Sequence, residues 1–392
     1  MSEISKNTTE KFAEAYQQNN KQNALQRGVV KNGITASAET IQGHVNNVPV
    51  FSVDVTTGKV SNQKQSGRCW MFAALNTFRH KMLNAFNLKD FELSQNHTFF
   101  WDKYEKANYF YENVLATAQE PLSSRKVAFL LQTPQQDGGQ WDMIVSIFQK
   151  YGVVPKAVMP ESSNSSNSRD LNNYLNKKLR KDAGTLRQLV ADGQSEAAIQ
   201  EAKEGMLQEI YNFLATSLGT PPETFDFEYR DEEKNYHIDR GLTPQTFYDK
   251  YVGVDLDDYV SIINAPTADK PYNKSYTVEM LGNVVGGKEV KYLNVDMETF
   301  KKLAIAQLEQ GESVWFGCDV GQSSTRDSGI MALDAYDMND LFDIDFTMTK
   351  AQRLDYGESL MTHAMVLTGV DIVDGKSTKW KVENSWGEKV GT

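Results

Sequence analysis

The 392-residue sequence has little cysteine and no long apolar run. Its two cysteines, Cys69 and Cys318, allow at most one intrachain disulfide. This excludes the small disulfide-stapled secreted folds and favours a reducing cytosol. No apolar stretch approaches the length that spans a bilayer, and the first residues lack the apolar segment of a secretory signal. We therefore expect a cytoplasmic protein that has no membrane partner.

Positive charge is also in short supply. Lysine and arginine total 41 against 52 aspartates and glutamates, which gives a net charge of −11. This balance argues against general binding to nucleic acid. The glycine pairs form no dinucleotide fingerprint, and the acidic segment 322–350 does not have the spacing of a calcium loop. We expect neither a metal nor an organic cofactor.

Residues 63–72 are typical of a loop that runs into a helix. Cys69 falls in the first turn of this helix, whose apolar residues recur at helical spacing from Met71 to Met82. The positive end of a helix stabilises thiolate over thiol, so this position predicts a lowered pKa and a nucleophile. The alternative is a small buried hydrophobic residue, the usual role of a free cysteine.

The chain has five histidines, and His363 is the candidate base because it opens a strand that returns as a hairpin. A two-residue loop at Asp374-Gly375 pairs residue 373 with 376, which brings His363 opposite position 386 and close to Asn384. An asparagine can hold an imidazole in one tautomer without adding charge. Taken singly, His363 could be a strand-end histidine that is satisfied by backbone, and Asn384 could be a turn residue.

These motifs carry a family resemblance. Gln63, Gln-Ser-Gly-Arg-Cys-Trp-Met-Phe-Ala around Cys69, and Val-Glu-Asn-Ser-Trp-Gly around Asn384 resemble the bleomycin hydrolase and bacterial aminopeptidase C family of papain-like cysteine peptidases. The likeness runs from about residue 40 onward. It implies an α+β papain-like fold, with a helical half, a β-barrel-like half and a helical insertion.

The same resemblance implies the chemistry and the site residues. Peptides would lose N-terminal residues through an acyl-enzyme, bleomycin-like amides would also be hydrolysed, and the assembly would be a homohexamer. The catalytic residues would be Cys69, His363, Asn384 and Gln63, with Gln63 in the oxyanion hole. The substrate-binding residues would be Gly138, Gly139 and Trp386. Without the resemblance, two adjacent glycines before a helix are usually just a turn.

Family members continue beyond the position of Thr392 into an arm that enters the cleft and restricts cleavage to free N-termini. The resemblance therefore leaves two alternatives, a fragment or a protein without this gate. A chain without the gate would act as an endopeptidase or transferase. A third alternative is a binding or scaffold protein on an inactive peptidase fold.

The chain is expected to divide into four parts. Within them, the polar segment that begins at residue 161 is typical of a low-complexity linker, and His97 lies in an aromatic-rich helix where a structural role is expected. The parts are an N-terminal helix with an extended lead-in at 1–60, a catalytic helical half at 61–160, a helical insertion at 161–240 and a β-rich half at 241–392.

Overall fold

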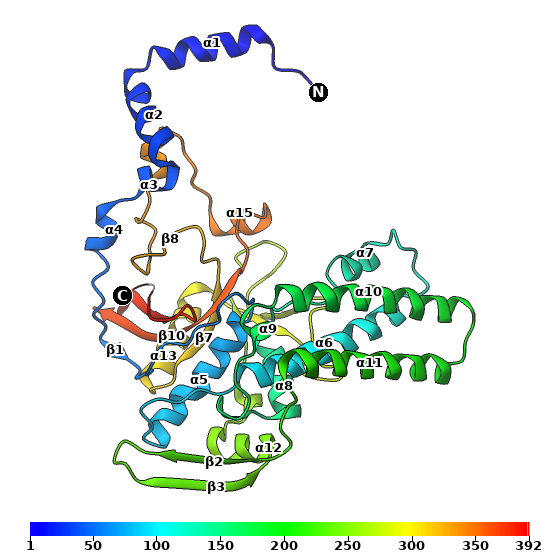
Figure 1. Ribbon diagram of the computed structural model, residues 1–392. Coiled ribbons are helices and arrows are strands. Elements are labelled where there is room, and N and C mark those ends of the chain that lie inside the picture. The colour runs from blue at the N-terminus through cyan, green and yellow to red at the C-terminus, as the bar shows by residue number, and fades with distance from the viewer. Residues whose placement is uncertain (390, 392) are drawn as a thin grey trace. The chain divides into compact units, whose positions relative to one another are not determined.

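Figure 1 shows the computed structural model, which describes residues 1–389 and 391. The chain forms two compact units. Residues 1–50 and 319–360 make the smaller unit, and residues 51–318 and 361–389 make the larger one. No helix of the described residues is long and apolar enough to cross a membrane.

The smaller unit is built mainly from short helices. The lead-in after the N-terminal helix was expected to be extended, and this is wrong for residues 28–32 and 34–45, which are largely helical. Thr40 is the N-cap residue of the helix at Ile41–Val45, because its side chain accepts a hydrogen bond from the Gly43 backbone N–H. The elements of this unit are α1 (Lys6–Gln17), α2 (Asn20–Asn32), α3 (Ile34–Ala38), α4 (Ile41–Val45), β8 (Ser324–Thr325), β9 (Ile330–Met331), α14 (Met338–Phe342) and α15 (Lys350–Asp355).

The larger unit holds the main apolar core, which α5, α6 and α8 share with the insertion helices α10 and α11. Its helices are α5 (Cys69–Ala85), α6 (Gln95–Ala116), α7 (Arg125–Gln132), α8 (Trp141–Tyr151), α9 (Ser163–Ser166), α10 (Arg169–Ala191), α11 (Glu196–Leu218), α12 (Pro244–Phe247), η1 (Tyr248–Val252), η2 (Leu256–Asp258) and α13 (Met297–Glu309). Its strands are β1 (Val53–Asp54), β2 (Phe225–Arg230), β3 (Tyr236–Leu242), β4 (Ile262–Ile263), β5 (Lys274–Thr277), β6 (Lys291–Asn294), β7 (Val314–Cys318), β10 (His363–Val373) and β11 (Lys376–Glu383).

Strand β10 is the centre of the main sheet. It pairs antiparallel with β7, β1 and β11. The β10–β11 hairpin has the predicted register at its turn, because Val373 pairs with Lys376. Asp374 and Gly375 have φ values of 50° and 74°, which is the left-handed backbone that a two-residue hairpin turn requires. The hairpin prediction is therefore confirmed.

The insertion differs from its prediction in two places. Residues 225–242 form the β2–β3 hairpin rather than helix, and the alternating Phe225, Phe227 and Tyr229 are a strand pattern. The serine-rich segment at 161–168 is also more than a loose linker, because Ser165 and Ser168 are buried. Helices α10 and α11 form the long hairpin that is prominent in Figure 1.

Candidate active site

Cys69 is the first residue of α5, with Arg68 as the N-cap residue. Its side chain is partly buried against the main core. The backbone of Ala364, the residue after His363 in β10, lies close enough to the thiol to lower its pKa. The candidate nucleophile from α5 and the candidate base from β10 therefore meet at one point in the larger unit.

Burial raises the pKa of the Cys69 thiol, and the negative charge of Asp137 acts in the same direction. The backbone N–H groups of Ala364, Trp70 and Cys69 lower this pKa but do not outweigh burial. The predicted lowering at the helix N-terminus is therefore wrong for this thiol, because an isolated thiolate loses more hydration here than the helix end returns. A thiol with a raised pKa needs a partner to take its proton.

His363 has the geometry of such a partner. Its Nε2 lies 2.8 Å from Asn384 Oδ1, and the Ser385 backbone N–H donates to the same oxygen at 2.7 Å. Because the Ser385 backbone N–H can only donate, the atom that it contacts is the amide oxygen, so His363 Nε2 must carry the hydrogen. Burial lowers the pKa of His363, while the Asn384 hydrogen bond opposes this shift. The neutral ring then has its lone pair at Nδ1.

The sheet fixes where His363 stands. His363 is paired with Cys318 across β7, and Ala364 is paired with Gly317. On its other side the imidazole stacks on Trp386, with ring centroids 5.0 Å apart and planes 25° apart. The predicted proximity of His363 to residues 384 and 386 is thus present in the structure.

Gln63 is held by hydrogen bonds to Ser66 and Ser385. Its Nε2 donates to the Ser66 carbonyl at 2.7 Å, and its Oε1 accepts from Ser385 Oγ at 2.6 Å. Its backbone N–H donates to the Ser385 carbonyl at 2.8 Å. Since the backbone of Ser385 also orients Asn384, one residue links the two amide side chains of the site. The side-chain nitrogen of Gln63 keeps a second N–H for another acceptor.

The two glycines of the 136–140 loop have different surroundings. A Cβ on Gly139 would lie 2.7 Å from the Trp70 ring, so the packing of this ring itself requires glycine there. A Cβ on Gly138 would meet nothing closer than 3.9 Å. The carbonyl of Gly138 accepts a hydrogen bond from Lys106 Nζ at 2.7 Å, which ties this loop to α6. Gly138 therefore presents open backbone, whereas Gly139 has a packing role.

Comparison with known proteins agrees with this geometry. The model of the Peptidase C1-like family matches residues 3–392. The chain belongs to this family. Aminopeptidase C of Streptococcus thermophilus is 62% identical over 392 residues, covering 100% of this chain and 88% of the relative. Aminopeptidase C of Lactococcus lactis subsp. lactis is 59% identical, covering 99% and 88%.

A solved structure is similar throughout. The crystal structure of pepw from Lactobacillus rhamnosis hn001 superposes with a TM-score of 0.98 at 67% identity, covering 100% of this chain and 87% of that one. The predicted family and the papain-like α+β fold class are confirmed by these matches. The predicted class of enzyme, a cysteine-type aminopeptidase hydrolase, is confirmed by the same relatives.

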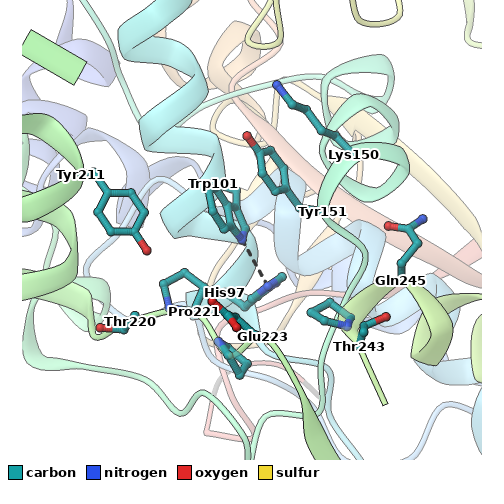
Figure 2. A pocket seen from close by; sticks show the side chains of 12 residues that line it. His97, Trp101, Lys150, Tyr151, Tyr211, Thr220, Pro221, Glu223, Thr243 and Gln245 are labelled. Atoms are coloured by element: carbon teal, nitrogen blue, oxygen red, sulfur yellow. Dashed lines mark hydrogen bonds between the residues drawn. The ribbon is translucent and has the colours of Figure 1, made fainter. Parts of the chain in front are cut away.

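The remaining histidines of this peptidase have other partners. His97 is buried, its Nε2 accepts from Trp101 Nε1 at 3.2 Å, and burial lowers its pKa to about 3. It lines a pocket with Tyr151, Tyr211 and several prolines, shown in Figure 2. The expected structural role of His97 fits a ring that stays neutral. The others pair as His44 with Glu39, His80 with Glu383 and Ser313, and His237 with Asp231.

Sequence reasoning missed two features of the site. Ser385 was quoted only as part of a motif, although it joins Gln63 to Asn384. Asp137 is not among the predicted site residues, although its carboxylate accepts from the Gly67 backbone N–H at 2.9 Å. A charged residue beside a glycine pair was a signal for Asp137, but its partners are far away in sequence.

Proposed function

We propose that this peptidase removes N-terminal residues from peptides through a Cys69–His363–Asn384 triad. The observation that carries the proposal is the hydrogen bond from His363 Nε2 to Asn384 Oδ1, combined with the contact between the Cys69 thiol and the Ala364 backbone. This pairing leaves Nδ1 as the nitrogen that can accept the thiol proton. The three groups that the proposed triad needs are then assigned: a nucleophile, a base and a residue that orients the base.

The first half of the reaction acylates Cys69. His363 Nδ1 accepts the thiol proton as the sulfur bonds to the scissile carbonyl carbon, and the carbonyl π electrons move to the oxygen. His363 then donates that proton to the leaving amine as the C–N bond breaks. The neutral Asn384 oxygen stabilises the imidazolium through a hydrogen bond, and it raises the pKa of the ring less than a carboxylate would.

The oxyanion needs preorganised donors. The free N–H of the Gln63 amide and the first-turn N–H of Cys69 are the proposed pair. The Gln63 side chain is fixed by Ser66 and Ser385 before substrate binds. The Cys69 N–H has no carbonyl four residues earlier within α5, since it belongs to the first turn. Neither donor then needs to reorganise during the reaction.

Water completes the cycle. His363 takes a proton from a water molecule, whose oxygen bonds to the acyl carbon, and the C–S bond breaks. The thiolate recovers the proton from His363, and the released acid is the N-terminal amino acid. No step in this sequence requires a metal or an organic cofactor.

Substrate binding is assigned to Gly138, Gly139 and Trp386. The open position at Gly138 supports backbone contact with an extended peptide, and Trp386 lies directly against the imidazole. We also propose a cytoplasmic location, activity on bleomycin-like amides and a homohexameric state, all on the family resemblance. The unbridged cysteines Cys69 and Cys318 support the location.

The test uses two fluorogenic amides, one with a free α-amine and one N-acylated, on the wild type and on Cys69→Ala. We expect release from the free-amine substrate only, and no release by Cys69→Ala above background. Release from both substrates would instead favour an endopeptidase or transferase. Activity retained by the alanine variant would refute the thiol mechanism. Circular dichroism and thermal melting of the variant serve as the folding control.

A further inference from the structure

The side chain of Asp137 lies at the junction of three segments of the larger unit. Its Oδ2 accepts from the Gly67 backbone N–H at 2.9 Å and from Ser168 Oγ at 2.5 Å. Its Oδ1 accepts from Asn172 Nδ2 at 2.8 Å and lies 2.7 Å from Lys103 Nζ. The loop before Cys69, helix α6 and the start of α10 thus meet at one carboxylate.

Asp137 also holds the residue after Cys69. Its backbone carbonyl accepts from Trp70 Nε1 at 2.6 Å. Asp137 therefore contacts both Gly67 and Trp70, which flank the stretch that contains Cys69. The approach is close, since a Cβ on Gly67 would lie 2.9 Å from Asp137 Cβ. One residue therefore holds the Gly67 backbone on one side of Cys69 and the Trp70 side chain on the other.

The pair of Asp137 and Lys103 is charged although it is buried. Asp137 is 7% exposed and Lys103 is 0% exposed. Burial alone would raise the pKa of Asp137, but the Lys103 ammonium and the surrounding hydrogen bonds hold it well below its usual range. Burial lowers the pKa of Lys103 to about 8, against the raising effect of Asp137. Both groups are therefore ionised at neutral pH.

We propose that Asp137 is a positioning residue that sets the direction of the Cys69 backbone N–H. This inference rests on the proposed function, in which that N–H binds the oxyanion. The insertion takes part in this positioning, because Ser168 and Asn172 provide two of the four polar groups that contact the Asp137 carboxylate. The helical insertion thus supports the loop before Cys69 through its contacts with Asp137.

The test compares Asp137→Asn with Asp137→Asn/Lys103→Met. The single change removes the charge and leaves Lys103 buried without its counterion, so both Tm and kcat should fall. The double change removes both charges and should restore most of the Tm. If Asp137 positions the oxyanion donor, kcat in the double variant stays at least about tenfold below wild type while KM moves less than about threefold.

Asp182→Asn is the matched control. Asp182, which lies in α10, is also a buried carboxylate. Its partners are Lys178 and Tyr111, and it has no hydrogen bond to residues 63–70. It should lower Tm with kcat unchanged. A double variant whose kcat returns together with its Tm would overturn the inference, and so would an Asp182 variant whose kcat falls as far. If Asp137→Asn does not fold, the double variant alone decides by the same criterion.

Labelling separates this inference from the proposed function. Iodoacetamide alkylates a thiol by displacement at carbon and forms no oxyanion, so its rate with Cys69 should fall less in the double variant than kcat does. If alkylation of Cys69 leaves wild-type hydrolysis intact, the proposed function itself fails. If alkylation abolishes wild-type hydrolysis but the double variant keeps wild-type kcat, only the role of Asp137 fails.

Discussion

The surroundings of Cys69 and of His363 are built from different interactions. The loop that ends at Cys69 is flanked by buried ions, the Arg68–Glu161 pair at 2.7 Å and the Asp137–Lys103 pair at 2.7 Å. His363 instead contacts the neutral Asn384 and Trp386. Charge fixes the backbone where a rigid donor is needed, whereas neutral partners leave the imidazole free to gain and lose a proton.

After the loss of Cys69 itself, the largest loss of rate is expected from Gln63, the proposed oxyanion donor. Gln63→Ala should lower kcat by about 100-fold, the effect typical for loss of one such donor, with a much smaller change in KM. Gln63→Glu is the matched control, because it keeps the shape but replaces the donor by a negative charge, and should be at least as slow. An alanine variant with wild-type kcat, measured at saturating substrate, would remove Gln63 from the mechanism.

Adding a charge beside His363 would remove the difference between its neutral surroundings and the charged surroundings of Cys69. Because burial lowers the pKa of His363, the acid limb of kcat/KM should lie below pH 6.5, the ordinary value for histidine. Asn384→Asp places a carboxylate at Nε2, which favours the imidazolium, so the limb should move to higher pH. Asn384→Ala removes a bond that raises this pKa, so the limb should move to lower pH.

Both Asn384 variants should also be slower than wild type at neutral pH, by about tenfold or more. In Asn384→Ala the tautomer is less well held, and in Asn384→Asp a larger fraction of His363 is protonated and cannot accept the thiol proton. The measurement is a pH profile of kcat/KM for the three proteins. Limbs that coincide in all three would show that His363 is not the group whose ionisation controls the rate. A limb that moves to lower pH in Asn384→Asp, or to higher pH in Asn384→Ala, would contradict the neutral role of Asn384.

Breaking an ion pair beside Cys69 should act first on stability. Glu161→Gln leaves the fully buried guanidinium of Arg68 without its bidentate partner, a loss of about 3–5 kcal/mol in the free energy of unfolding. Arg68→Met/Glu161→Met removes both charges and should recover most of that loss. Denaturant unfolding measures both variants. Equal stability of the single and double variants would show that the charges are not what matters.

Several of these features were predictable from sequence because they are local. The apolar spacing from Met71 to Met82 predicted α5, and Asp374-Gly375 predicted the hairpin that brings Asn384 to His363. The turn chemistry and the period of the pattern are enough for such elements. The order Gln63, Cys69, His363, Asn384 then supplied the resemblance.

The rest depends on tertiary packing. The thiol pKa was predicted in the wrong direction because the helix end is visible in the sequence and the burial of Cys69 is not. The pairing of Asp137 with Lys103 and Asn172 joins residues more than thirty positions apart, without any periodic signal. The serine-rich segment before α10 is compositionally like a linker, and only its buried contacts make it structural.

The smallest effect should come from the glycine pair. Gly139→Ala forces a Cβ against the Trp70 ring and should cost about 1–3 kcal/mol of stability, as overpacking does. Gly138→Ala meets open space and should leave the stability nearly unchanged, while raising KM if substrate backbone binds there. Thermal unfolding and KM are measured on both. A Gly138 variant that is the less stable of the two would contradict this assignment.

The central claim is that Cys69 is the nucleophile. The most direct measurement titrates the wild type with limiting iodoacetamide and follows residual hydrolysis against the labelled fraction of Cys69 and of Cys318 by peptide mass spectrometry. We expect activity to fall in proportion to the label on Cys69 and to reach zero at one label per chain. Activity that survives complete labelling of Cys69, or that follows the label on Cys318 instead, would contradict the account.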